Sequence, residues 1–360
     1  MPCSQPSSDF SRTMRMTREL PANRGRIVWH AKITVAVLPL ILFSCSTVME
    51  RDPLPGYSTI SSFGEQVRTL TFDSGVKVTI NAGPASKFDW GAPVDLVFYA
   101  LPNGNTTEQT IGKVVSDSID WHFGIQHIGA QTRRLREVMA GRTIVVAYLE
   151  APRLSWPLWR RQYEGGSPMI RNIVDSIASL MPANDVRITL SGHSGGGSFV
   201  FGYLNSVDRI PERVRRISFL DSNYGYSAGE RHGEKLIAWL NESSDHCLSV
   251  IAYDDRNITL NGKPVIGPDG GTYRRTLEMK EALQKVFVLT DSVRDNIRRF
   301  RGLDGRIDIL LHENPENRIL HTTLVGEMNG FIQAMTSGTA FEGIAGLFNG
   351  PIAYKKWIAP

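Results

Sequence analysis

The feature that most constrains the fold is a glycine-rich hexapeptide in the middle of the chain, Gly-His-Ser-Gly-Gly-Gly at residues 192–197. An apolar run rich in β-branched residues, 186–190, precedes the hexapeptide, and an apolar stretch follows it at 199–201. This order predicts a strand, a sharp turn and a helix, with Ser194 at the corner. Glycines on both sides of the serine are expected, because a tight turn brings backbone close to backbone and a Cβ atom would clash there.

The hexapeptide contains the pattern G-x-S-x-G, which indicates a nucleophilic serine when a strand precedes it and a helix follows. We therefore predict that Ser194 is a nucleophile, and that the N–H groups at the start of the helix favour a developing negative charge beside it. An ordinary Gly/Ser turn is the alternative interpretation. A phosphate-binding loop is not predicted, since no lysine follows the glycines at the spacing G-x-x-x-x-G-K-[ST].

The first 44 residues have the pattern of an export signal. A basic stretch ends at Lys32, an apolar run follows at 33–43, and Ser44 and Cys45 come next. Such a run is too short to span a bilayer but fits the apolar part of a signal peptide. Residues 42–45 resemble the lipobox of bacterial lipoproteins, which implies cleavage before Cys45 and lipid attachment to its sulfur. Plain secretion and an uncleaved anchor are the alternatives.

The charge of the chain does not predict a nucleic-acid partner. Six of the 40 Lys and Arg residues and two of the 36 Asp and Glu residues lie in the predicted signal peptide. The rest of the chain is therefore formally neutral and lacks the basic excess of a nucleic-acid-binding protein.

Three cysteines, Cys3, Cys45 and Cys247, are too few for a disulfide framework in the exported chain. Removal of Cys3 and acylation of Cys45 leave Cys247, which has apolar neighbours and is expected to be a small buried residue. No H-E-x-x-H or C-x-x-C spacing is present, so we predict no metal site, and nothing in the sequence indicates a cofactor.

Beyond the signal, the pattern divides into a tether and a folded domain. Residues 46–65 are rich in Ser, Pro and Gly, so the predicted organisation is a signal peptide over 1–44, a tether over 45–66 and one domain over 67–360. In that domain the periodicity predicts a first hairpin, then alternating strands and helices. The predicted strands are 68–72, 76–80, 94–101, 143–148, 186–190, 216–220, 248–253 and 306–311, with a small hairpin over 257–265. The predicted helices are 125–139, 169–181, 196–205, 229–240, 273–286, 292–300 and 321–335.

Strands that alternate with helices predict an α/β fold, with a mostly parallel sheet covered by helices on both faces. Two early hairpin strands, the strand–helix units that follow them and the serine turn after the fifth predicted strand together resemble the α/β-hydrolase family. The resemblance covers roughly residues 67–340. It implies a serine nucleophile followed along the chain by an acid and then by a histidine.

The resemblance implies that the histidine follows the last strand, where two candidates lie. His312 directly continues the predicted strand 306–311. His321 comes after a polar loop, 313–318, which can carry an imidazole back over the serine, so we favour His321. A capping or surface histidine is the alternative interpretation for either residue.

Three aspartates are candidates for the acid that orients the histidine. Asp254 ends the strand 248–253, the position that the acid of this family most often has, and it is ranked first. Asp221 ends the preceding strand and is ranked second, while Asp255 is next to Asp254 and would point in a different direction. A polar residue that caps a strand end is the alternative interpretation for all three.

The oxyanion hole of the family requires backbone N–H donors at two places. One is expected at Gly195, directly after the nucleophile. The other is expected in the loop after the strand 94–101, where position indicates Asn103 and Gly104. An ordinary Asn-Gly turn is the alternative interpretation of this loop.

Several aromatic residues and one acid follow the third and fourth predicted strands. Trp121 and His122 form one group, and Trp156 and Trp159 form the other. They are expected either to line a substrate cleft or to pack loops onto the sheet. Glu150, at the end of its strand, is either a substrate contact or a surface charge.

These observations favour an exported serine hydrolase, facing the periplasm, that cleaves an ester-like acyl bond of a small molecule or polymer. A membrane contact is expected only through the lipid at Cys45. The alternative is a non-catalytic envelope protein that uses the hydrolase scaffold for binding. The sequence does not indicate which ester is the substrate.

Overall fold

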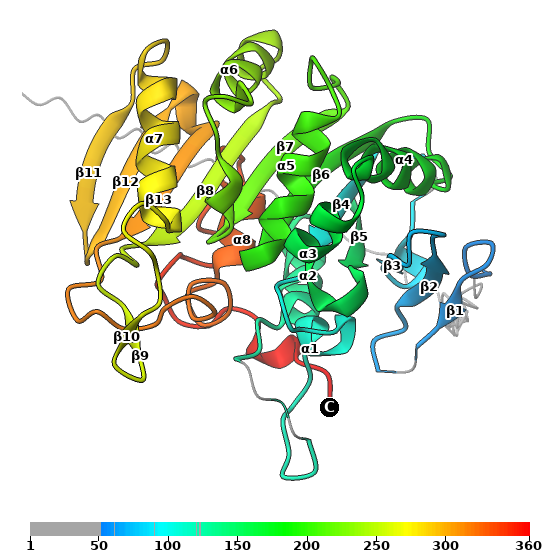
Figure 1. Ribbon diagram of the computed structural model, residues 1–360. Coiled ribbons are helices and arrows are strands. Elements are labelled where there is room, and N and C mark those ends of the chain that lie inside the picture. The colour runs from blue at the N-terminus through cyan, green and yellow to red at the C-terminus, as the bar shows by residue number, and fades with distance from the viewer. Residues whose placement is uncertain (1–51, 61, 90, 120, 122–123) are drawn as a thin grey trace, which may run out of the picture. The chain divides into compact units, whose positions relative to one another are not determined.

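One mixed sheet organises the part of the chain that this computed structural model describes, residues 52–360 without 61, 90, 120, 122 and 123. The predicted signal peptide, Cys45 and His122 lie outside the described residues. The sheet has the strand order β1-β2-β3-β5-β4-β6-β7-β8-β13-β12-β11 (Figure 1). Its strands are β1 (Ser58–Thr59), β2 (Gln66–Thr71), β3 (Lys77–Ala82), β4 (Val94–Ala100), β5 (Thr143–Glu150), β6 (Val186–His193), β7 (Val214–Leu220), β8 (Cys247–Tyr253), β11 (Thr290–Arg294), β12 (Ile297–Gly302) and β13 (Ile307–His312).

The middle of the sheet is parallel and its two edges are antiparallel. Neighbouring strands pair in parallel from β5 through β4, β6, β7 and β8 to β13. The hairpin β2–β3 extends one edge and the hairpin β11–β12 extends the other. The central strands are almost continuously apolar, as expected of parallel strands that helices cover on both faces. A separate small hairpin pairs β9 (Thr259–Leu260) with β10 (Lys263–Pro264), as predicted.

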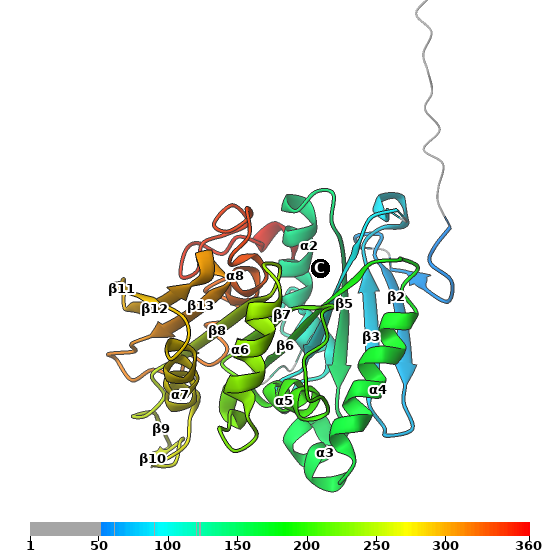
Figure 2. The same cartoon turned by 90° about the horizontal axis from the view of Figure 1, so that it is seen from above.

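Helices cover both faces of the sheet (Figure 2). On one face lie α3 (Trp156–Gln162), α4 (Gly166–Ser179), α5 (Gly197–Asn205), α6 (His232–Glu242) and α7 (Thr272–Gln284). On the other lie α2 (Ile128–Val138) and α8 (Gly330–Thr336), with α1 (Thr107–Ile111) beside α2. Because side chains alternate along a strand, each face has its own apolar core: Leu96 and Phe98 belong to one, and Val97 and Tyr99 to the other.

The segment predicted as a tether is folded over its described residues. Leu54 is buried in the core, and its backbone N–H donates to the side chain of Gln66 at 2.6 Å. Strand β1 pairs with β2, and the buried carboxylate of Glu65 binds two arginines of α2. The folded unit therefore begins before residue 67, and its described part includes Leu54 and β1.

The prediction of a helix over 292–300 is wrong. The segment forms β11 and β12, which pair antiparallel around Asp295 and Asn296. Both of these residues have positive φ, 50° and 61°, as the favoured two-residue hairpin turns require. Arginines dominate the segment and obscure its alternation, which on β12 places Ile297 and Phe300 in the cores.

Two other predicted helices are shorter than expected. The segment 321–335 is helical only from Gly330, and residues 321–328 form successive turns. Asn329, with φ of 57°, separates the turns from α8. Helix α2 starts at Ile128 instead of 125, after His127 in a left-handed conformation. Among the described residues, no helix is long and apolar enough to cross a bilayer.

Candidate active site

Ser194 stands at the corner between β6 and α5. The strand ends at His193, a single 3-10 turn covers Ser194–Gly196, and α5 starts at Gly197. Ser194 itself has φ of 54°, a left-handed conformation that a non-glycine residue rarely adopts, and its side chain is half-buried. The serine lies at the carboxyl end of β6 beside β4, where the chain changes direction across the sheet, which is a preferred ligand position in open α/β sheets.

Close backbone approaches explain why glycines surround Ser194. A Cβ atom at Gly192 would lie 2.8 Å from the carbonyl oxygen of Gly196. At Gly196 it would lie 2.2 Å from the carbonyl oxygen of Ala100, and at Gly197 it would lie 1.6 Å from that of Ser222. No side chain larger than hydrogen fits these positions, so the predicted steric role of the glycines is confirmed.

His321 and Asp221 meet beside the serine turn. The Nδ1 atom of His321 forms a short hydrogen bond with Oδ2 of Asp221, although the residues are 100 positions apart in the sequence. Asp221 directly follows β7 and is fully buried, whereas the His321 side chain is 27% exposed. Because an ionised carboxylate can only accept, Nδ1 carries the proton and Nε2 is the basic nitrogen of the ring.

His193 holds the segment of His321 against the serine turn. Its Nε2 donates to the backbone carbonyl of His321 at 3.0 Å, and the two rings have their centroids 4.5 Å apart. Burial, together with the neighbouring His321, lowers the pKa of His193 well below its ordinary value, so this ring is neutral. Since His193 directly precedes Ser194, these contacts hold the segment of His321 beside the serine turn. Among the hydrogen bonds of the described residues, none joins Ser194 Oγ to the His321 ring.

Asp254 and His312, which the sequence also indicated, are engaged elsewhere. Asp254 was ranked first as the acid, but its carboxylate binds the guanidinium of Arg256 at 2.6 and 2.8 Å, away from His321. Burial raises the pKa of Asp254, but the hydrogen bonds from Arg256 outweigh that effect and hold it below the ordinary value. His312 Nδ1 accepts from the backbone N–H of Asn314 at 2.9 Å. The structure therefore places the second-ranked acid, Asp221, at the favoured histidine.

Thr272 links Asp221 to a second buried carboxylate, Asp255. Thr272 Oγ1 donates to Oδ1 of Asp221, and the backbone N–H of Thr272 donates to Asp255 at 2.8 Å. Burial, together with the charge of Asp221, raises the pKa of Asp255 to about 6. Thr272 opens α7. Gly271 before it requires glycine for two reasons: its φ is 96°, and a Cβ atom would lie 2.5 Å from the Asp255 carboxylate. Sequence reasoning missed Thr272, and the Gly-Thr pair at a helix start was its only local signal.

The two residues predicted as oxyanion donors in the loop after β4, Asn103 and Gly104, differ in whether their backbone N–H is already bonded. The N–H of Gly104 donates to the carbonyl of Leu154 at 2.9 Å, so it is not free for an oxyanion. Asn103 is exposed and directly covers the serine turn: a Cβ atom on Gly195 would lie 2.0 Å from Asn103 Oδ1. The geometry thus removes Gly104 from the candidate donors and leaves Asn103 and Gly195 side by side.

The predicted aromatic lining is mostly core. Trp156 and Trp159 are each 1% exposed, and their indole N–H groups donate to the carbonyls of Leu149 and Ser74. Their role is packing, and the cleft interpretation is wrong for both. Trp121 is half-buried, with the ammonium of Lys113 5.5 Å from the centre of its ring.

Glu150 is a structural contact. Its carboxylate accepts from the N–H and hydroxyl of Thr107 at 2.7 and 2.8 Å, and Lys77 contributes an ion pair at 3.3 Å. Glu150 therefore ties the first turn of α1 to the end of β5. In the described part of the chain, no group of three or more His, Cys, Asp or Glu residues is arranged to hold a metal ion. Cys247 is buried and unpaired, as expected.

Comparison with known proteins gives distant likenesses in structure alone. No family model matches the chain, and no curated protein matches its sequence. A thermostable esterase has a TM-score of 0.43 and 11% identity over 79% of this chain, which spans 64% of that protein's length. An acetyl xylan esterase from Aspergillus awamori has a TM-score of 0.41 and 12% identity, with 69% of this chain and 92% of that one covered. The siderophore hydrolase EstB from Aspergillus nidulans has a TM-score of 0.39 and 12% identity, with 77% of this chain and 98% of that one covered.

The architecture of the chain itself defines its fold class. A mostly parallel sheet carries helices on both faces and a strained serine between β6 and α5. The chain has an α/β-hydrolase-like fold.

Proposed function

We propose that the protein is a serine hydrolase that cleaves an ester-like acyl bond. Ser194 attacks the carbonyl carbon, and His321 Nε2 accepts the serine proton and then passes it to the leaving alcohol. Asp221 holds the imidazole in the tautomer with Nδ1 protonated and stabilises the imidazolium that forms. Water then releases the acid in a second round of the same proton transfers.

The oxyanion of the tetrahedral intermediate is assigned to the backbone N–H groups of Gly195 and Asn103. Gly195 lies in the turn that leads into α5, whose N-terminus favours negative charge. Each such donor contributes about 3–4 kcal/mol to the stability of the transition state. Of the two residues predicted in the loop after β4, Asn103 is retained and Gly104 is not, because the N–H of Gly104 is already bonded to Leu154.

The observation that carries this proposal is the hydrogen bond between His321 Nδ1 and Asp221. His321 belongs to a segment that His193 holds beside the turn with the strained Ser194. A buried carboxylate on one ring nitrogen leaves the other nitrogen basic, which is what a serine hydroxyl needs to become a nucleophile. The absence of a direct Ser194–His321 hydrogen bond is compatible with catalysis, because such bonds often tighten only when substrate binds.

A fluorophosphonate probe tests the proposal on the purified protein. We expect covalent labelling of wild type and none of Ser194→Ala, with hydrolysis of short p-nitrophenyl esters lost in parallel. Ser179→Ala is the matched control, since Ser179 is an exposed serine at the end of α4. Unlabelled wild type with a normal unfolding transition would instead favour a non-catalytic binding protein on the same scaffold.

We also propose that the protein is an exported lipoprotein, anchored through Cys45. The support is the basic and apolar pattern of residues 1–44 and the sequence before Cys45. Metabolic labelling with a fatty acid should mark the wild-type protein and not Cys45→Ala. Equal labelling of both proteins would exclude this anchor.

A further inference from the structure

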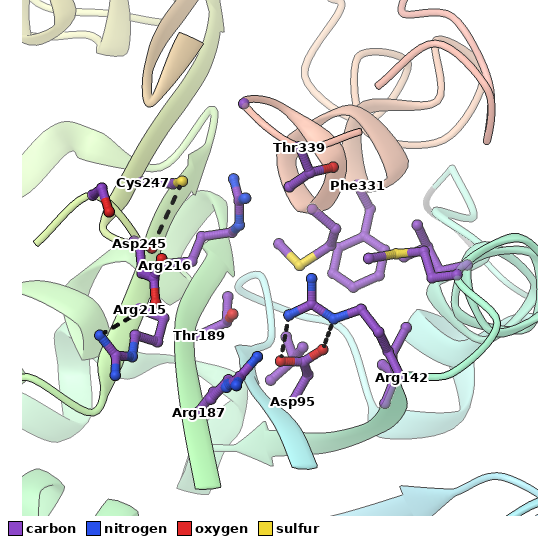
Figure 3. Close-up of a pocket in the computed structure, with 17 residues that line it drawn as sticks. Asp95, Arg142, Arg187, Thr189, Arg215, Arg216, Asp245, Cys247, Phe331 and Thr339 are labelled. Carbon is purple, nitrogen blue, oxygen red and sulfur yellow. Dashed lines mark hydrogen bonds and ion pairs between the residues drawn. The ribbon is translucent and has the colours of Figure 1, made fainter. Parts of the chain in front are cut away.

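A second polar site lies at the edge of the sheet opposite Ser194. A cavity of about 260 Å³ opens at the amino ends of the parallel strands, under α2 and α8 (Figure 3). Ser194 lies at the carboxyl end of β6, whereas Arg187 of the same strand lines this cavity. The cavity is therefore separate from the candidate active site, and nothing in the proposed reaction uses it.

Strand register explains why polar side chains gather here. Asp95 of β4 pairs with Arg187 of β6, and Thr189 of β6 pairs with Arg216 of β7. Residues in register project from the same face of a sheet, and positions two apart on one strand share that face. The row continues to Cys247, which pairs with Arg216. This part of the sheet face is thus polar, although the rest of the same face forms an apolar core.

Four arginines line the cavity: Arg142, Arg187, Arg215 and Arg216. In Figure 3 the side chains of Arg142, Arg187 and Arg216 extend into the space between the strands and the segment that carries Phe331, whereas Arg215 points away. Arg142 makes a two-pronged ion pair with Asp95, at 2.5 and 2.8 Å. Arg142 is thereby held in place with its charge compensated.

Neither of the other two guanidiniums that extend into the cavity is paired with a carboxylate among the described lining residues: Asp95 binds Arg142, and Asp245 lies 3.8 Å from Arg215. Arg187 pairs with Asp185, which lies outside the lining, at 2.9 Å. Arg216 is 8% exposed, and its donors reach only neutral oxygens: the carbonyls of Ala334 and Ser337 and the hydroxyl of Ser337, at 3.0–3.2 Å. A buried cation without an anionic partner is costly, so an anion that entered the cavity would gain a strong interaction.

The side chains that α2 and α8 contribute are apolar, whereas Ser244, Asp245 and Thr339 add polar groups elsewhere in the lining. Leu135 and Met139 come from α2 and the residue after it, and Phe331 and Met335 come from α8. Methionines adapt their shape to an apolar guest. The volume is slightly below that of typical drug-sized sites, so it suits a small molecule.

We propose that this cavity binds a small organic oxyanion with a short apolar chain, its carboxylate or phosphate held by Arg187 and Arg216 and its chain against Phe331 and Met335. Guanidinium groups bind both oxyanions in the same two-pronged manner. The proposal does not rest on the hydrolase function.

Isothermal titration of the purified full chain tests the proposal with four probes: hexanoate, hexyl phosphate, hexanol and inorganic phosphate. We expect at least one of the two hexyl oxyanions to bind at a single site, and comparison of the two identifies the preferred head group. Hexanol should not bind, and inorganic phosphate should bind at least tenfold more weakly because it lacks the chain. Equal affinity for inorganic phosphate would overturn the apolar part of the proposal.

Variants locate the binding. Arg187→Gln should weaken it by about tenfold or more, since a charge-assisted hydrogen bond is lost. Asp95→Asn should tighten it, because the substitution removes a competing carboxylate and frees Arg142 for the ligand. Arg294→Gln is the matched control: Arg294 is 92% exposed on β11, outside the lining, and its substitution should change nothing.

Ser194→Ala distinguishes this cavity from the candidate active site. The variant should bind the oxyanion with wild-type affinity, whether or not the proposed hydrolysis exists. Loss of binding in Ser194→Ala, unchanged binding in Arg187→Gln with a normal unfolding transition, or no binding of either hexyl oxyanion to wild type would each overturn the proposal.

Discussion

At the scale of single residues, Asp221 and Asp254 follow adjacent parallel strands, and their surroundings separate their roles. Asp221 contacts His321 and Thr272, whereas Asp254 contacts Arg256. We predict that Asp221→Asn lowers kcat/KM for a short ester by about 10⁴-fold, because the amide favours the wrong imidazole tautomer. Asp254→Asn, the matched control, should stay within about threefold of wild type. A larger loss in Asp254→Asn than in Asp221→Asn would reverse the assignment.

The raised pKa of Asp255 should make the free energy of unfolding depend on pH. Its pKa is raised from 3.8 to about 6 in the folded protein, so between these pH values the folded state binds more protons than the unfolded state. Stability contributed by this group is present below pH 4 and is lost as the pH rises through 6. The loss is at most about 3 kcal/mol, at about 1.4 kcal/mol per pKa unit.

Urea unfolding at pH 4 and at pH 7 measures this effect. Asp255→Asn, which cannot ionise, should gain stability relative to wild type as the pH rises between these values. Asp73→Asn is the control, since Asp73 is an exposed residue in the turn between β2 and β3. A difference between wild type and Asp255→Asn that does not vary with pH would contradict the prediction.

At the scale of elements, the start of α5 is packed against the loop after β7. Because a Cβ atom at Gly197 would lie 1.6 Å from the carbonyl oxygen of Ser222, Gly197→Ala forces the helix away from the sheet. We predict a loss of stability of about 3 kcal/mol or more, measured by urea unfolding. Gly165→Ala, with φ of −83° and no atom within 4 Å of the added methyl, should change stability by less than about 0.5 kcal/mol. Similar losses in both variants would contradict the proposed close packing.

Local patterns predicted elements well where apolar residues alternate or repeat without interruption. The strand 94–101 was found because its side chains are buried on both faces, so nearly every position is apolar. The strand 186–190 was found because apolar Val, Ile and Leu alternate with polar residues. The strand β12 was missed because three of its six residues are arginines. Asp295 and Asn296 between β11 and β12 were the available hairpin signal, because this residue pair tolerates positive φ.

At the scale of the whole molecule, a buried ion network joins residues near 65 to α2. Glu65 binds Arg133 at 2.7 Å and Arg136 at 2.7 Å, and its side chain is 2% exposed. Glu65→Ala would leave two guanidiniums without their carboxylate, so we predict a loss of about 3–5 kcal/mol in the free energy of unfolding. Glu108→Ala, which breaks an exposed pair with Lys113, should cost less than about 1 kcal/mol. Equal costs would mean that the segment before β2 contributes little to the fold.

The sequence by itself determined the turn that holds Ser194, because the strand period, the glycine sterics and the helix start all lie within about twenty consecutive residues. It also indicated His321, whose polar loop is a local feature. Only the tertiary structure decided that Asp221 binds this histidine, that the Gly104 N–H is occupied by Leu154 and that Trp156 and Trp159 belong to the core. Each of these outcomes depends on contacts between residues far apart in the chain, and their geometry follows from strand order and register across the sheet, which no local pattern encodes.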